Sequence, residues 1–70
     1  MPLTLLKDGE ESVIVRITGE PEVRRRLMDM GFIEGSRLRV LSCVCGNLIV
    51  EAKNIRIALD KKLAKNIKVA

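Results

Sequence analysis

The segment from Pro21 to Ser36, PEVRRRLMDMGFIEGS, constrains the fold of this chain more than any other stretch. Its proline fits the first position of a helix, where the missing N–H costs no hydrogen bond. Val23, Leu27 and Met30 follow at the spacing of one helix face, so they predict a stripe that packs on a core. The segment therefore predicts a short α-helix over about residues 21–30.

Two glycines end this helix and redirect the chain. Gly31 suits the left-handed position just past a helix, where Phe32 can fold back on Leu27. Gly35 suits the position in a type II turn that needs a positive φ. A strand then begins at Arg37, so a turn of fixed shape joins the helix to the strand.

Short apolar runs elsewhere in the chain predict strands. The expected strands are Ser12–Ile17, Arg37–Val44, Leu48–Lys53, Ile55–Leu59 and Ile67–Val69. Alternation within the first of them predicts that Val13, Val15 and Ile17 face the core.

Three further features complete the pattern. Leu3–Leu6 is expected as a short extended segment. Cys45–Asn47 and Asn54 suit the turns of two hairpins. Asp60 fits an N-cap, which predicts a helical turn near residues 60–65.

About five strands, one short helix and short connections predict a mainly β fold. A chain of 70 residues is expected to form a single domain over residues 1–70, because so short a chain buries only one small core. Closing the strands into a small barrel removes exposed sheet edges. We therefore expect a small barrel of about five strands.

The residue types present exclude several classes of function. Histidine is absent and no G-x-S-x-G motif occurs, so we do not expect an enzyme. Phe32 is the only aromatic residue and the net charge is a mild +4, so a nucleic-acid partner is not expected. No apolar run approaches the roughly 18–20 residues that cross a bilayer. The chain is therefore predicted not to insert into a membrane. Its only two cysteines lie two positions apart and cannot staple a small secreted domain, which predicts a cytoplasmic protein.

Three consecutive arginines, Arg24, Arg25 and Arg26, are the strongest candidate for a site. Glu22 and Asp29 stand at spacings that suit ion pairs within the helix, which would make the run a solvated, salt-bridged face. Three adjacent residues cannot share one helix face, so one arginine is expected beside the core stripe, anchored on a carboxylate or a backbone oxygen. The others would then contact a partner. Both roles stay open.

Cys43 and Cys45 form the one metal-like motif. Residues two apart on a strand share a face, so the two thiolates could meet a soft transition metal ion. A structural zinc site takes four ligands, and only these two thiolates are available. The other interpretation is a core cysteine beside a turn neighbour. No cofactor is firmly implied, and a transition metal ion at this pair is the alternative.

The central motif resembles the FeoA family, the small ferrous-iron transport proteins A. That family has a basic helix followed by L-x-D-M-G, a short spacer and a second glycine. This chain supplies RRRLMDMG over residues 24–31, FIEG over residues 32–35 and a strand LRVL over residues 38–41. The flanks agree as well, for example IAL over residues 57–59, so the resemblance covers nearly the whole chain.

The resemblance implies an SH3-like barrel and a non-catalytic cytoplasmic accessory protein of ferrous-iron uptake. Its partner would be the cytosolic, G-protein-containing part of a FeoB-type membrane transporter, which would hold the chain at the inner face of the membrane. The expected partner-binding residues are Arg24, Arg25, Arg26, Asp29 and Glu34, and the residues that would shape the motif are Leu27, Met30, Gly31 and Gly35. A metal-binding or metal-sensing domain that uses Cys43 and Cys45 is the alternative. A weak homo-oligomer through an exposed edge strand stays open.

Overall fold

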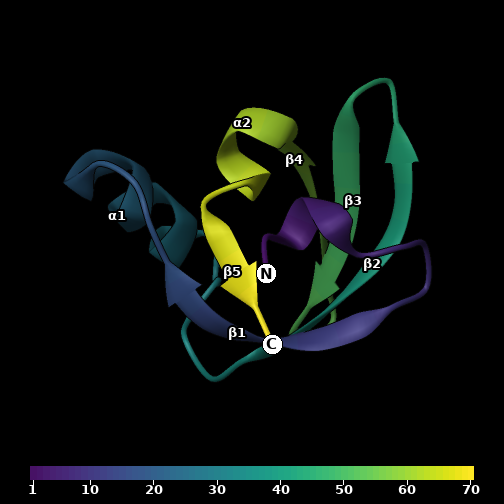
Figure 1. The fold of residues 1–70 in the computed structure, drawn as a ribbon, viewed down its shortest axis with the longest axis horizontal. Helices are drawn as coiled ribbons and strands as arrows, with labels where there is room; N and C mark the ends of the chain where they lie inside the picture. Colours follow the sequence, from purple (N-terminus) through teal and green to yellow (C-terminus); the bar gives the residue numbers. More distant parts are fainter.

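The computed structural model describes all 70 residues and is mainly β. Five antiparallel strands form one sheet in the order β4-β3-β2-β1-β5 (Figure 1). The strands are β1 (Glu11–Ile17), β2 (Arg37–Val44), β3 (Asn47–Ala52), β4 (Ile55–Asp60) and β5 (Ile67–Val69). The helical segments are the 3-10 turn η1 (Leu3–Leu5), α1 (Pro21–Asp29) and α2 (Lys61–Ala64). The predicted five strands, short helix and helical turn are confirmed.

Two tight hairpins set the register of β2, β3 and β4. Cys45 and Gly46 join β2 to β3 with φ angles of 50° and 81°, and Lys53 and Asn54 join β3 to β4 with φ angles of 53° and 66°. Positive φ at both central residues is the geometry of the type I′ turn, which matches the twist of paired strands. The turns predicted at these two places are confirmed.

Fifteen buried apolar side chains form one core, and no polar or charged side chain is buried with them. Phe32, the single aromatic residue, is among the fully buried side chains. α1 contributes Leu27 to the core, while Val23 and Met30 pack against it at partial exposure. This stripe fixes which side of α1 faces the sheet and leaves the opposite side to solvent.

A hydrogen-bonded stop ends α1. The Phe32 N–H donates to Leu27 O at 3.0 Å, and the Gly31 N–H donates to Met28 O at 2.9 Å. This pair of bonds is the Schellman motif, and Gly31 supports it with a φ of 104°. The burial of Phe32 over Leu27 adds the apolar contact that accompanies such a stop.

The turn after α1 is tied directly to β1. The Ser36 N–H donates to Ile33 O at 3.0 Å, which closes the turn, and Gly35 adopts a φ of 89°. The Gly35 N–H donates to Ile14 O at 2.7 Å, and the Ile14 N–H donates to Ser36 O at 2.9 Å. The end of α1, the turn and β1 are therefore held in one arrangement.

The prediction for the start of the chain is wrong. Leu3–Leu5 form a 3-10 turn instead of an extended segment, and the Leu6 N–H donates to Leu3 O at 3.0 Å. The turn brings both Leu3 and Leu6 onto the core, whereas Leu5 stays exposed. Burial of two residues three apart selects a helical turn, because an extended chain turns alternate residues inward.

The predicted inward face of the first strand is right for Ile17, which is buried, and wrong for Val15 and Ile14. Ile14 is buried, and Val15 is 52% exposed. The pairing of β1 with β5 shifts register between Ile14 and Arg16. A bulge of this kind breaks the alternation of faces, so Ile14 and Ile17 both reach the core although they lie three residues apart.

Both α-helices are short. α1 has 9 residues and α2 has 4. Asp60 caps α2 as predicted, since its Oδ1 accepts a hydrogen bond from the Leu63 N–H at 2.8 Å. Neither helix has the length and the apolar character that crossing a membrane requires.

Candidate docking groove

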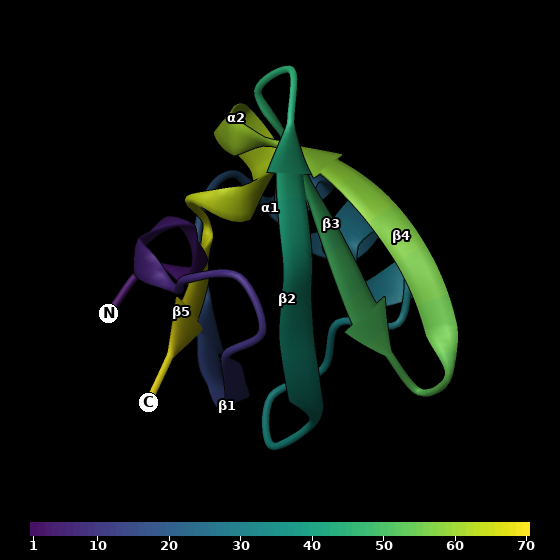
Figure 2. The ribbon, with the colours of Figure 1, turned by 90° about the vertical axis from the view of Figure 1, so that its right-hand side faces the viewer.

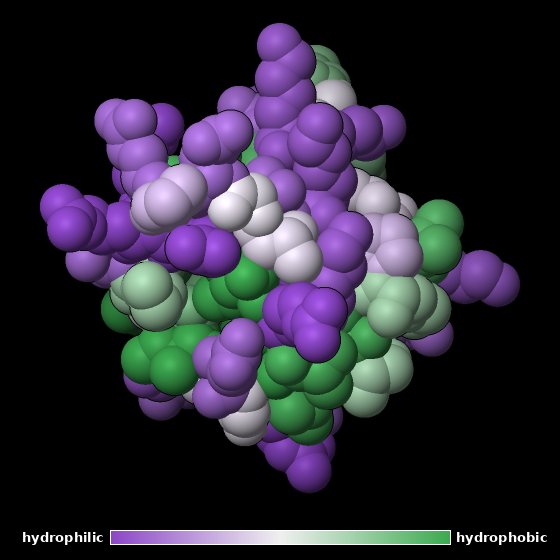
Figure 3. All heavy atoms as spheres, turned by 60° about the vertical axis from the view of Figure 1, so that its left-hand side comes forward, coloured by the Kyte–Doolittle hydropathy of each residue, from purple (hydrophilic) through white to green (hydrophobic).

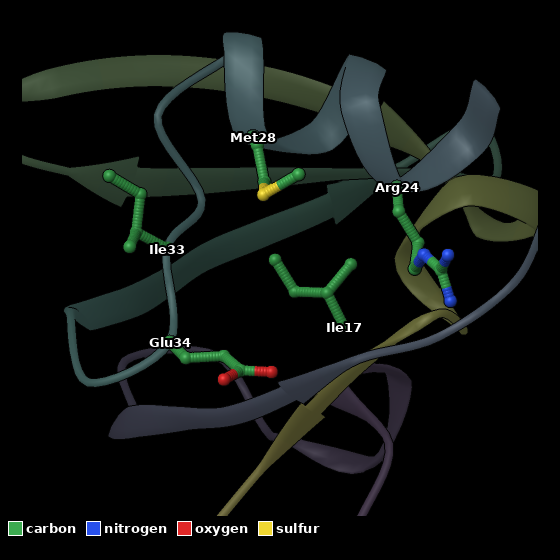
Figure 4. Close-up of a pocket in the computed structure, with 5 residues that line it drawn as sticks. All are labelled: Ile17, Arg24, Met28, Ile33 and Glu34. Atoms are coloured by element: carbon green, nitrogen blue, oxygen red, sulfur yellow. The ribbon is translucent and has the colours of Figure 1, made fainter. Parts of the chain in front are cut away.

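A shallow groove opens where α1, the end of β1 and the turn after α1 meet. It has a volume of about 370 Å³ and is lined by Ile17, Arg24, Met28, Ile33 and Glu34 (Figure 4). Arg24 and Met28 lie one helical turn apart, so they project from the same face of α1. The hydrogen bonds between the turn and β1 hold the other three residues beside them. We call this hollow the α1 groove.

The α1 groove is largely apolar. Met28 is 52% exposed and Ile33 is 46% exposed, while Ile17 belongs to the edge of the core. Figure 3 shows apolar surface gathered on this side of the molecule, next to strongly hydrophilic side chains. Large apolar side chains that are exposed together in a hollow are typical of a surface that a partner covers.

Two opposite charges flank this apolar surface. Arg24 comes from α1 and Glu34 from the turn, and Figure 4 shows both side chains beside the apolar ones. Neither forms an ion pair, because the two ion pairs of the structure join Arg37 and Arg39 to Glu11, at 3.4 and 3.6 Å. Both charges are therefore free to pair with groups of a partner.

The remaining predicted contact residues lie outside the α1 groove. Arg25, Arg26 and Asp29 are exposed, and none of them lines it. No ion pair joins the arginines to Glu22 or Asp29, so the expected salt-bridged helix face does not form. The only arginine side chain that donates a hydrogen bond is that of Arg37, so the expected anchoring of a helix arginine is absent as well. An exposed ion pair gains little against the entropy lost by fixing two long side chains.

Reasoning from sequence missed three of the five groove residues as site residues. Ile17 was expected only as a core residue. Met28 falls outside the inward stripe of α1, and Ile33 is an apolar residue in an otherwise polar turn. These two departures from the amphipathic pattern were the available signal, although single exposed apolar residues are common on protein surfaces.

The structure places Cys43 and Cys45 away from the core. Both thiols are exposed, so the interpretation as a core cysteine is wrong. They lie at the tip of the β2–β3 hairpin, which projects beyond the other strands (Figure 1). No group of three or more cysteine, aspartate or glutamate side chains comes together as a metal site. Metal binding by these two thiols alone would fall short of the four ligands of a structural zinc site.

Comparison with known proteins identifies the family. The family model described as the FeoA domain matches residues 1–70, which is the whole chain. The chain belongs to the FeoA family. A FeoA relative from Methanocaldococcus jannaschii, named Fe(2+) transport protein A, is 35% identical over 68 residues, which cover 97% of this chain and 83% of that protein. The resemblance noted in the central motif is thus confirmed.

A second FeoA relative is fused to a transporter. This protein of Porphyromonas gingivalis is named an Fe(2+) transport protein A/Fe(2+) transporter FeoB fusion protein. It is 40% identical over 43 residues, which cover 61% of this chain and 5% of the fusion protein.

Solved FeoA structures have the same fold. The crystal structure of an iron uptake regulatory protein (FeoA) matches with a TM-score of 0.91 at 30% identity, over 99% of this chain and 92% of that one. Stenotrophomonas maltophilia FeoA, crystallised in complex with zinc and described as an SH3 domain protein, matches with a TM-score of 0.87 at 25% identity, over 100% of this chain and 89% of that one. The expected SH3-like fold is confirmed.

Proposed function

We propose that this chain is a non-catalytic, cytoplasmic accessory protein of ferrous-iron uptake that docks on the cytosolic part of a FeoB-type transporter. The observation that carries the proposal is the P. gingivalis relative, whose name joins Fe(2+) transport protein A and FeoB in one chain. A fusion holds two proteins at high effective concentration, so it is typical of partners that work in contact. The G-protein-containing region, at the inner face of the membrane, is the expected point of contact.

The α1 groove is the surface that suits this docking. An apolar side chain of the transporter would fill the space between Met28 and Ile33. Arg24 would pair with an acidic group and Glu34 with a basic group beside that side chain. Apolar anchors supply most of the energy of an interface, while charges at its rim give orientation and speed. Further rim contacts would come from Arg25, Arg26 and Asp29.

The α1 groove is also preformed. The Schellman bonds fix the end of α1, and the bonds of Gly35 and Ser36 with Ile14 fix the turn that carries Ile33 and Glu34. A surface that is ordered before binding loses less conformational entropy when a partner arrives.

The test is an NMR titration of the 15N-labelled chain with the isolated cytosolic region of a FeoB-type transporter at physiological ionic strength. We expect the peaks of residues 24–35 to shift. Ile33→Glu places a charge in the groove and should weaken binding about tenfold or more. Val44→Glu makes the same change in charge at the hairpin tip, where Val44 is 53% exposed, and should leave the affinity within about twofold.

Two outcomes would contradict the proposal. Absence of binding at high micromolar concentrations would exclude the cytosolic region of the transporter as the partner. An equal loss of affinity in Ile33→Glu and Val44→Glu would be consistent with this partner but would exclude the α1 groove as its binding site.

The metal-binding alternative rests on the exposed thiols of Cys43 and Cys45 and on the zinc complex of the S. maltophilia relative. Titration with zinc or ferrous iron, followed by thiolate absorbance, separates it from docking. The double variant Cys43→Ser/Cys45→Ser should abolish binding if these thiols hold the ion. Unchanged metal affinity in that variant would end this alternative.

A further inference from the structure

The two outer strands of the sheet, β5 and β4, differ in whether another segment pairs with their outer edges. The edge of β5 is covered by the start of the chain: the Val69 N–H donates to Met1 O at 2.6 Å, and Pro2 forms a bridge with Lys68. β4 is the outer strand at the other end of the sheet, at the right-hand side of Figure 2, and no such segment pairs with it. An uncovered edge strand is a template for pairing with another chain.

The hairpin geometry determines which backbone groups of β4 face outward. A two-residue turn pairs Ala52 with Ile55, so Ile55, Ile57 and Leu59 direct their N–H and C=O groups toward β3. The alternate residues Arg56, Ala58 and Asp60 therefore direct theirs away from the sheet. All three residues are exposed. No backbone hydrogen bond from outside the sheet reaches Arg56 or Ala58, whereas the C=O of Asp60, the N-cap of α2, accepts the first hydrogen bond of that helix.

β4 also lacks the usual protection of an edge strand. Its pairing with β3 runs without a bulge from Ala52–Ile55 to Asn47–Asp60, and it contains no proline. Ile55, at its first position, is 57% exposed. Bulges, prolines and edge charges are the devices that discourage pairing, and Arg56 supplies the only positive charge within the strand.

We propose that two copies of this chain pair through their β4 edges as an antiparallel, two-fold symmetric dimer centred on Ala58. In this register Ala58 faces Ala58 of the second copy, so each donates its N–H to the other's C=O. Arg56 faces Asp60 of the second copy, and the symmetry repeats that pair on the other side. Both backbone groups of Ala58 and the N–H of Asp60 thus supply the backbone hydrogen bonds, and Arg56 and Asp60 supply two reciprocal ion pairs.

Charge selects this register over its neighbours. Pairing centred on Arg56 would place two arginines directly opposite each other, which is destabilising. Pairing centred on Ile57 would place Arg56 opposite Ala58 and leave the arginine without a partner. Within one copy Arg56 is free, because it forms no ion pair with Glu51 across the hairpin. Asp60 uses Oδ1 for the cap of α2 and keeps its second carboxylate oxygen for the new pair.

The dimer is tested by NMR on a mixture of differently labelled copies of the full chain. In an antiparallel pair centred on Ala58, Ile57 faces Leu59 of the second copy in a non-hydrogen-bonded pair, where the two Hα atoms lie close. We expect an intermolecular Hα–Hα contact between Ile57 and Leu59 at about 1 mM protein, because so short a contact makes a weak dimer. A monomer at that concentration, or intermolecular contacts at another surface, would overturn the proposal.

Charge exchange gives a second test. Arg56→Asp alone and Asp60→Arg alone each place like charges opposite each other, so each should be monomeric. An equimolar mixture of the two variants places opposite charges at both positions and should restore the intermolecular contact. Failure of the mixture to associate, while both variants keep their folded spectra, would overturn the register.

Asp60→Arg also removes the cap of α2, so a loss of the dimer in that variant could come from unfolding. Ala58→Pro is a second variant that leaves the cap in place. The Ala58 N–H faces away from the sheet, so proline there removes no hydrogen bond of the fold and should abolish only the dimer. A dimer that persists in folded Ala58→Pro would contradict the proposal. Ile33→Glu should dimerise like the unchanged chain, since the β4 edge shares no residue with the α1 groove.

Discussion

Gly31 ends α1 directly before the turn that carries two residues of the α1 groove, Ile33 and Glu34. Its φ of 104° lies where side chains are strained, and a Cβ built on it would meet no heavy atom within 4 Å. The space is open, so a substitution there would cost backbone energy and no steric clash. The Schellman stop would then be under strain at the point where Ile33 and Glu34 are positioned.

We predict that Gly31→Ala lowers the free energy of unfolding by about 1–2 kcal/mol, the cost of a left-handed conformation for a residue with a Cβ. Gly31→Asn should cost less, because asparagine tolerates this conformation better than alanine. Urea denaturation of the three proteins measures both differences. An Ala variant as stable as the parent would show that the helix end relaxes instead of holding its shape.

The elements with local signals were the ones that could be predicted from sequence. Pro21 and Gly31 bound α1, and Asp60 caps α2, because proline, glycine and capping residues act on the backbone within a few positions. The inward face of β1 could not be predicted, since the bulge between Ile14 and Arg16 arises from pairing with β5, some fifty residues away in sequence. The alternation of apolar residues within β1 contains no information about that distant pairing.

α1 has one face that packs on the core and one that is exposed to solvent. Leu27 is fully buried, whereas the next residue, Met28, is 52% exposed in the α1 groove. We predict that Leu27→Ala costs about 2–5 kcal/mol of unfolding free energy, because it leaves a cavity in a small core. Met28→Ala should cost less than about 0.5 kcal/mol and should still weaken docking. Thermal or urea unfolding beside a binding titration separates the two effects, and a large stability loss in Met28→Ala would make that face part of the scaffold.

At the scale of the whole molecule, the two charged residues of the α1 groove were among those singled out from the sequence, and its three apolar residues were not. Arg24 and Glu34 stood out as charges near the central motif. Ile17 joins them only because the turn after α1 is hydrogen-bonded to β1, through Gly35 and Ile14. A groove built from three segments is a property of their packing, so it cannot be predicted from any single segment of the sequence.

The whole-molecule charge and the α1 groove should act on different steps of docking. The net charge of +4 and Arg24 act at long range and so affect the rate of encounter, whereas Ile33 acts only in the docked complex. We predict that Arg24→Glu slows association a few fold at low salt, and that this difference fades at about 0.5 M salt as charges are screened. Ile33→Glu should instead accelerate dissociation at every salt concentration.

Lys53→Glu is the matched control for this kinetic prediction, because it changes the net charge as Arg24→Glu does but lies in the β3–β4 turn, outside the α1 groove. Association and dissociation rates measured by surface plasmon resonance across a salt series should therefore place Lys53→Glu close to the unchanged chain. If Lys53→Glu slowed association as much as Arg24→Glu, net charge alone would guide the encounter and the position of Arg24 would not matter. If affinity fell steeply with salt while Ile33→Glu had no effect, the contact would be electrostatic, and the apolar side chains of the α1 groove would have no part in it.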